Sequence, residues 1–183
     1  PEGGATPEQP APTSPAAPVA SVIKYPTDCA DAATCDYYLT HADNGDSVDF
    51  TFSVRAPNPG WASLGFSTDR NMGDDAVIDC ILNNGAVTVQ NSYNPGLFNT
   101  PLTGSLDLGL SATSGEYIDG RISCAFTRQK TVSGEPRVFD LNVPHYVMMA
   151  MGPAFGDNKI PHGFSGADLP TTTTNTVNFS TSR

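Results

Sequence analysis

Residues 47–55 alternate strictly between apolar and polar side chains, and this pattern constrains the fold more than any other part of the sequence. Every second position is apolar, and these positions are Val48, Phe50, Phe52 and Val54. Successive side chains of a β-strand point to opposite faces, so a period of two predicts a strand with one buried face. Such a strand is stable only in a sheet whose apolar face is covered by a second layer.

Further strand-like segments follow along the chain. They are residues 61–66, 76–82, 86–91, 117–126, 137–141, 145–151 and 173–179. Turn sequences lie between them, such as Asn-Pro-Gly at 58–60 and Asn-Asn-Gly at 83–85. No window of a dozen residues has a helical stripe, and 17 Gly, 16 Pro and only 15% charged residues suit short strands joined by turns. These features predict an all-β protein, built as an antiparallel sandwich or barrel.

The first twenty residues differ from the rest in composition. They are rich in Pro and Ala and have no apolar periodicity, so we expect a disordered stalk over 1–20 and one folded domain over 21–183. The formal net charge of −10 argues against nucleic acid or an anionic membrane as the partner. We expect neither a membrane span nor a signal peptide in this sequence, because no apolar run approaches the roughly 18 to 20 residues of a span.

The chain has four cysteines, and none of them forms a CxxC pair. An even number with few lysines fits two disulfides in an oxidising compartment, and the alternative is four free thiols in a cytosolic protein. Three pairings are possible. We expect Cys29–Cys35 as a local loop and Cys80–Cys124 as a link between two central strands, and we expect a secreted or cell-surface location.

Two polar loops each contain a residue able to ligate a transition metal. Met72 lies in the acidic segment 67–75, and His162 lies in the Gly- and Pro-rich segment 152–171. A thioether and an imidazole are both ligands of haem iron or copper. His41 and His145 lack any such setting. The sequence contains no GxSxG, HExxH, P-loop or GxGxxG signature, and only four Glu are present, so nothing favours a hydrolase.

Several segments together resemble the DOMON domain family. They are GWASLGFS at 60–67, MGDDAVIDC at 72–80, GRISCAFTR at 120–128, the strand 146–152 with its AMG ending, and IPH at 160–162. The resemblance covers roughly residues 25–180. It implies an antiparallel β-sandwich of about ten strands, as in ferric-chelate reductases, stromal-cell-derived-receptor-type proteins and the cytochrome domain of cellobiose dehydrogenase.

The resemblance also implies a cofactor, one non-covalent b-type haem held between a Met and a His at the positions of Met72 and His162. The absence of CxxCH argues against covalent attachment. Candidate wall residues of the haem pocket are Trp61, Phe66, Tyr93, Phe98, Tyr146 and Met148. Arg70 and Lys159 are the candidate partners of the propionates.

The resemblance therefore implies an extracellular electron-transfer domain rather than a stand-alone catalyst. Its expected partners are a transmembrane b-type cytochrome or flavoprotein domain, or a small molecule such as ascorbate or a ferric chelate. Three alternatives remain open. The domain could bind a sugar or a catechol-like ligand without haem, it could hold copper through His and Met, or it could be a structural adhesion domain.

Overall fold

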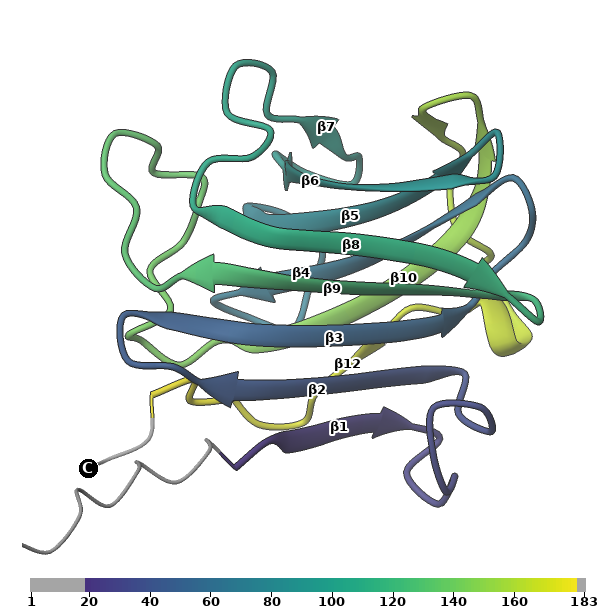
Figure 1. Ribbon diagram of the computed structural model, residues 1–183, viewed down its shortest axis with the longest axis horizontal. Helices are drawn as coiled ribbons and strands as arrows, with labels where there is room; N and C mark the ends of the chain where they lie inside the picture. Colours follow the sequence, from purple (N-terminus) through teal and green to yellow (C-terminus); the bar gives the residue numbers. More distant parts are fainter. Residues whose placement is uncertain (1–18, 181–183) are drawn as a thin grey trace, which may run out of the picture.

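The computed structural model describes residues 19–180 of the chain, without the side chain of residue 167, and consists of two antiparallel β-sheets packed face to face (Figure 1). The predicted all-β sandwich is therefore confirmed. The first sheet has the order β1 (Ser21–Tyr25), β2 (Tyr37–Asp43), β3 (Ser47–Arg55), β9 (Arg121–Gln129) and β8 (Leu110–Ile118). The expected stalk over 1–20 lies almost wholly outside the described residues and stays a prediction.

The second sheet carries the loops that matter for function. Its order is β11 (Asn158–Lys159), β10 (Tyr146–Phe155), β4 (Gly60–Ser67), β5 (Asp75–Asn83), β6 (Ala86–Asn94) and β7 (Thr100–Pro101). The short strand β12 (Thr171–Thr172) also pairs with β10. Within the described part of the chain, the one helical element is the 3₁₀ turn η1 (Gly166–Asp168). No helix in that part is long and apolar enough to cross a membrane.

The alternating residues of β3 lie in the core between the sheets, as the sequence predicts. Val48, Phe50, Phe52 and Val54 are each at most 2% exposed. Phe50 stacks on Phe126 of β9, with ring centroids 5.3 Å apart, and meets Phe66 of β4 across the sandwich at 5.8 Å. The buried apolar area of these rings is the main contribution that holds the two layers together.

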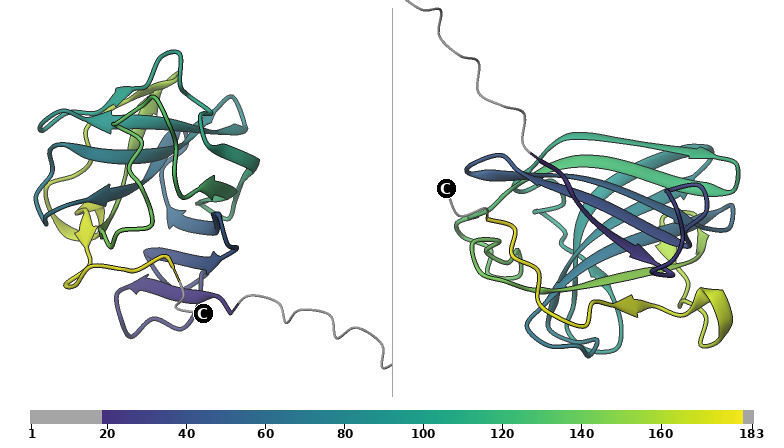
Figure 2. Two further views of the ribbon diagram at one scale, coloured as in Figure 1. Left: turned by 90° about the vertical axis from the view of Figure 1, so that its left-hand side faces the viewer. Right: turned by 90° about the horizontal axis from the view of Figure 1, so that it is seen from below.

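Two of the predicted strands, 137–141 and 173–179, are wrong, and the predicted strand 117–126 consists of the end of β8 and most of β9, joined by a turn at residues 119–120. Residues 137–141 form a loop, in which the backbone N–H of Leu141 donates to Lys130 O and the Leu141 side chain is fully buried. Residues 173–179 make one isolated bridge, between Val177 and His145. In both segments the apolar side chains pack a connecting loop onto the core, and the backbone does not pair with a neighbouring strand along its length. Residues 171–180 run along the open side of the sandwich (Figure 2).

Both predicted disulfides are present. Cys29–Cys35 closes the connection between β1 and β2. Cys80 of β5 and Cys124 of β9 lie in different sheets, so their disulfide joins the two layers through the core. A cross-link between layers restricts the unfolded chain far more than a local one, because it closes a longer loop.

We expect the two disulfides to contribute unequally to stability. The chain-entropy relation assigns about 4 kcal/mol to the separation of 44 residues between Cys80 and Cys124, and about 2 kcal/mol to the separation of 6 residues between Cys29 and Cys35. Urea unfolding of the two double-alanine variants measures the difference. An equal loss in both variants, or no loss when Cys80 and Cys124 are replaced, would contradict this assignment.

Candidate functional site

The outer face of the second sheet is buried although it points away from the core. Residues of β4 and β5 alternate, so that Trp61, Ser63, Gly65 and Ser67 lie on this face beside Asp75, Val77, Asp79 and Ile81. Asp75 and Asp79 are 0% exposed, and Val77 is 5% exposed. A sheet face open to water would not bury carboxylates to this degree. Loops from both ends of the strands therefore cover it.

The loop with Met72 covers one end of this outer face. Residues 68–74 connect β4 to β5, and the Asp69 N–H donates to Ser67 Oγ at 3.2 Å. The Gly73 N–H donates to Asp75 Oδ2 at 2.9 Å. Both acceptors belong to the outer face, so the loop begins and ends at that face. The side chain of Met72 is half-buried.

Close packing and aromatic residues stabilise the Met72 loop. Gly73 has a φ of 138°, and its backbone lies against that of Gly96. A Cβ added to Gly73 would lie 3.6 Å from the Gly96 Cα. Tyr93 Oη donates to Asp74 Oδ1 at 3.3 Å. Burial, and then the nearby Asp74 carboxylate, raises the pKa of Tyr93, so this phenol keeps its proton.

The segment with His162 covers the opposite end of the same face. β11 pairs with the last residues of β10, and Trp61 Nε1 donates to Ile160 O at 2.9 Å. Lys159 Nζ donates to Ser63 Oγ at 2.8 Å and to Asp79 Oδ1 at 2.7 Å. The same ammonium lies 4.2 Å from the centroid of the Trp61 ring. The Trp61 indole thus holds Ile160, and the Ser63 hydroxyl and Asp79 carboxylate hold Lys159. These two residues lie just before His162 in the sequence.

The imidazole of His162 has a geometry suited to ligation. It is half-buried, and its Nδ1 lies 2.8 Å from Gly163 O, while the ring of Phe164 is 5.4 Å away. A neutral imidazole placed this way donates from Nδ1 to the carbonyl and keeps the lone pair on Nε2. A backbone carbonyl in this role is a common second partner of metal-bound histidines.

The two loops lie at opposite ends of one face. Trp61 and Ser67, which anchor the loops, are six residues apart on β4, roughly 20 Å at the rise of a strand. One iron atom can accept both ligands only if both loops lean toward the middle of the face, around Gly65. The middle of the face has no room for a larger side chain at Gly65, because a Cβ on Gly65 would lie 3.2 Å from Met148 Cβ. A thioether and an imidazole that flank one sheet face are suitable haem ligands. Because the two loops are anchored at opposite ends of β4, both side chains would have to extend toward the middle of the face to reach one iron atom.

The predicted wall and propionate residues are not all on this face. Trp61, Tyr146 and Met148 are, because they alternate with core residues along β4 and β10. Phe66 lies on the other side of β4, because its ring packs in the core against Phe50 and Phe179.

The other predicted residues lie near the loops. Tyr93 meets Phe139 beside the Met72 loop, and Phe98 is 63% exposed in the β6–β7 connection. Arg70 is exposed. Lys159 forms an ion pair with Asp79. No group of three or more His, Cys, Asp or Glu side chains that could hold a metal ion occurs in residues 19–180.

Sequence reasoning missed the two buried carboxylates. Asp75 Oδ1 and Asp79 Oδ2 are buried and have no hydrogen-bond partner among the described residues. The sequence does contain a signal for them. Side chains of residues 75–82 point alternately to the two sides of β5, and this places both acids on the side opposite Ile78, Cys80 and Leu82. An unsatisfied buried carboxylate oxygen is unfavourable, and each of these two oxygens is an acceptor without a partner beneath the covered outer face.

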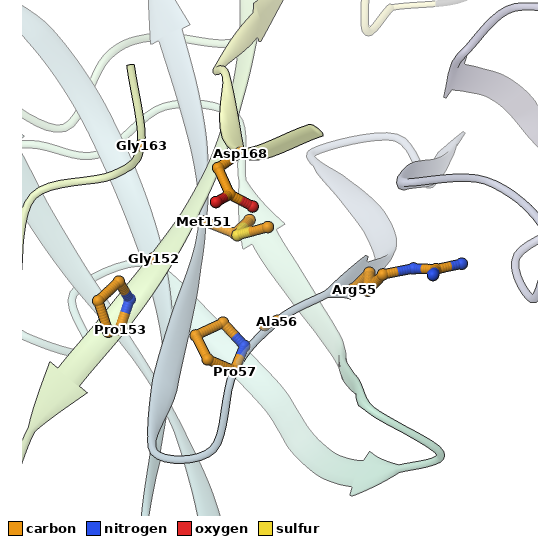
Figure 3. A pocket seen from close by; sticks show the side chains of 8 residues that line it. All are labelled: Arg55, Ala56, Pro57, Met151, Gly152, Pro153, Gly163 and Asp168. Atoms are coloured by element: carbon orange, nitrogen blue, oxygen red, sulfur yellow. The ribbon is translucent and has the colours of Figure 1, made fainter. Parts of the chain in front are cut away.

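A separate pocket of about 320 Å³ lies next to the His162 segment (Figure 3). Ala56, Pro57, Met151 and Pro153 give it apolar walls, and Gly163 and Asp168 close it from the segment after His162. Its volume is at the low end for small-ligand sites. Met151 faces the core side of β10, so this pocket does not lie between the two loops.

The fold and these loops define an antiparallel β-sandwich domain with one loop-covered outer face. The family described as DOMON domain matches residues 33–152, and the chain belongs to this family. Met72 lies inside the matched range and His162 lies beyond it.

Curated relatives are longer than this chain. The human DOMON domain-containing protein FRRS1L is 31% identical over 141 residues, which are 76% of this chain and 46% of FRRS1L. The human ferric-chelate reductase 1 is 32% identical over 140 residues, or 75% of this chain and 23% of that protein. The chain thus spans less than half of each of these relatives.

A solved structure also matches. The cytochrome domain of Myriococcum thermophilum cellobiose dehydrogenase aligns with a TM-score of 0.47 and 11% identity, covering 75% of this chain and 69% of that one.

We expect the Lys159–Asp79 ion pair to be essential for holding the His162 segment. Lys159→Met leaves a carboxylate with 0% side-chain exposure unpaired, which costs about 3 kcal/mol in the free energy of unfolding. Asp79→Asn in the same chain should recover part of this loss, because it removes the unpaired charge. Urea unfolding measures both effects. Arg70→Met, at an exposed position, is the control, and an equal loss in that variant would refute the role of the pair.

Proposed function

We propose that this chain is an extracellular electron-transfer domain that binds one b-type haem non-covalently, in which Met72 and His162 would hold the iron. One observation carries the proposal. The Met72 loop begins and ends at one end of the sheet face whose opposite end holds the His162 segment, and His162 Nδ1 lies against a backbone carbonyl, which leaves Nε2 for a metal. Membership of the DOMON family and the likeness to ferric-chelate reductase 1 support a redox role.

The haem would supply a centre that gains and loses one electron. If Met72 and His162 both held the iron, no position would be left for oxygen, and a thioether ligand would raise the potential relative to two imidazoles. Trp61, Tyr146 and Met148 exclude water from the outer face. Arg70 in the Met72 loop is the cation we assign to a propionate, since Lys159 is bound to Asp79.

The partners follow from charge and compartment. Two disulfides favour an oxidising, extracellular setting. A formal net charge of −10 favours a partner with a basic docking surface, with association that weakens as salt rises. We propose a transmembrane b-type cytochrome or flavoprotein domain as the electron partner, or ascorbate or a ferric chelate as a small-molecule one.

A second candidate function rests on the two open carboxylate oxygens. Asp75 Oδ1 and Asp79 Oδ2 lie on the same face of β5 and lack partners, so they would accept hydrogen bonds from the hydroxyl groups of a sugar or a catechol. Both carboxylates are fully buried, so such a ligand would reach them only after the segments that cover them move. In this case the domain binds a small ligand without haem. Such a protein would be colourless and fully folded.

The visible spectrum tests the proposal. We expect the purified, haem-supplied protein to have a Soret band, with sharp α and β bands after dithionite reduction. Met72→His should keep the iron six-coordinate and lower the midpoint potential, because an imidazole replaces the thioether. Met148→Leu is the matched control, since Met148 lies on the same face without being a proposed ligand.

Several results would overturn this proposal. One is a midpoint potential that is the same in Met72→His and in the parent protein. Another is a folded protein that takes up no haem, and a third is a metal analysis that finds copper in place of iron.

A further inference from the structure

The sequence contains one acceptor motif for N-linked glycosylation, Asn178-Phe179-Ser180. No other Asn in the chain is followed two positions later by Ser or Thr. The motif alone is common by chance, so its local structure decides its meaning. It lies at the end of the segment that runs along the open side of the sandwich (Figure 2).

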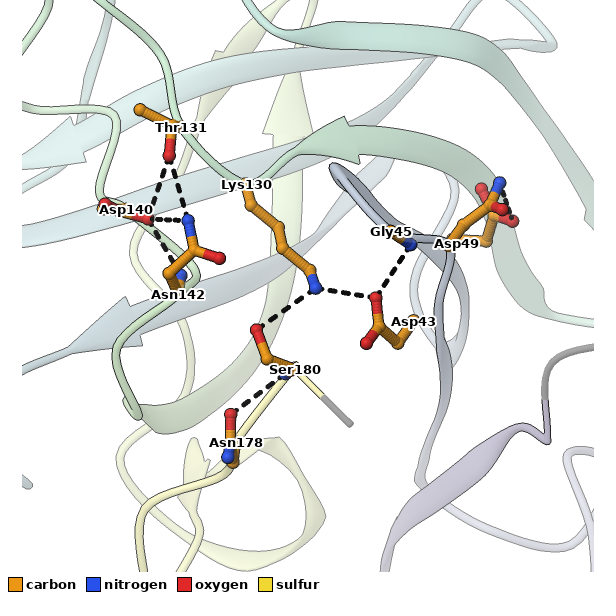
Figure 4. Close-up of polar contacts among 10 residues, drawn as sticks. Asp43, Gly45, Asp49, Lys130, Thr131, Asp140, Asn142, Asn178 and Ser180 are labelled. Atoms are coloured by element: carbon orange, nitrogen blue, oxygen red, sulfur yellow. Dashed lines mark hydrogen bonds and ion pairs between the residues drawn. The ribbon is translucent and has the colours of Figure 1, made fainter. Parts of the chain in front are cut away.

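The side chain of Asn178 is exposed and oriented. Its Oδ1 accepts a hydrogen bond from the Ser180 backbone N–H at 2.9 Å. This Asx turn fixes the amide group and turns Nδ2, the atom that a glycan modifies, away from the bond (Figure 4). Among the described residues Nδ2 has no hydrogen-bond partner, so the folded protein makes no use of the atom.

The neighbouring residues hold the motif in place. Phe179 is 1% exposed, and its ring centroid lies 5.0 Å from that of His41 and 5.5 Å from that of Phe50. Ser180 Oγ accepts a hydrogen bond from the buried Lys130 Nζ at 3.1 Å (Figure 4). In extended backbone, neighbouring side chains point to opposite sides, so an inward Phe179 turns Asn178 outward.

We propose that Asn178 carries an N-linked oligosaccharide. In this reaction Asn178 Nδ2 forms a bond to the anomeric carbon of an oligosaccharide pyrophosphate donor. The bond between that carbon and the pyrophosphate oxygen breaks, and Nδ2 loses one proton. The inference does not depend on haem, because it uses neither loop of the outer face.

The buried Phe179 also sets the order of events. A transferase must reach the residues around Asn178, and the core buries Phe179 between His41 and Phe50. The oligosaccharide is therefore added before the segment docks along the sandwich. The folded protein accommodates it afterwards, because the modified nitrogen faces solvent.

Expression of the full chain behind a secretion leader in a eukaryotic host tests this inference. Peptide mass spectrometry of the total protein, before and after an endoglycosidase that converts the modified Asn to Asp, reports the state of Asn178. We expect glycan on the parent chain and on Ser180→Thr, and none on Asn178→Gln or Ser180→Ala. Asn175→Gln, three positions earlier and also exposed, should keep the glycan.

An unmodified Asn178 in chains whose two disulfides have formed would overturn the inference. A glycan that persists in Asn178→Gln would also overturn it, because the modified atom would then lie elsewhere. The haem spectrum of the parent chain is measured separately, so failure of the glycan assignment is distinguishable from failure of the proposed electron-transfer role.

Discussion

The buried ion pair between Lys159 and Asp79 is the interaction on which the outer face of the second sheet depends. Asp79 lies in the middle of β5 with no exposed surface, and the lysine reaches it from the short strand β11. A buried charge is tolerated only with a partner and hydrogen bonds, and here Ser63 and Lys159 provide them. The pair therefore fixes β11 on the sheet and with it the segment that contains His162.

The sandwich beneath this face is a rigid support. Aromatic rings fill the space between the sheets, and the Cys80–Cys124 disulfide joins the layers behind the face that carries Asp79. Asp79 and Cys80 are neighbours on β5, and they point to opposite sides of the sheet. Cys80 thus links β5 to the opposite sheet through the core, and its neighbour Asp79 holds the segment that contains His162. Loops positioned by such a scaffold are where binding residues usually occur in β-sandwiches.

The sequence predicted the scaffold better than the site. The alternation in residues 47–55 and the cysteine pairs follow from local periodicity and spacing, and both agree with the structure. The sequence did not reveal that Phe66 faces the core, because the side of β4 on which it lies is decided by the register of β4 with β5 and β10. The Lys159–Asp79 pair joins residues 80 positions apart through a strand of two residues, which no periodicity reveals. Residues 137–141 have the composition of a strand but no neighbouring ladder to pair with.

We propose that a sulfur atom from the β4–β5 loop and an imidazole nitrogen from the segment after β11 bind the same iron atom. X-ray absorption at the iron edge of the haem-supplied protein tests it most directly. We expect one sulfur neighbour of the iron in addition to the porphyrin and imidazole nitrogens, and the loss of that sulfur in Met72→His. A shell made of nitrogen alone in the parent protein would contradict it.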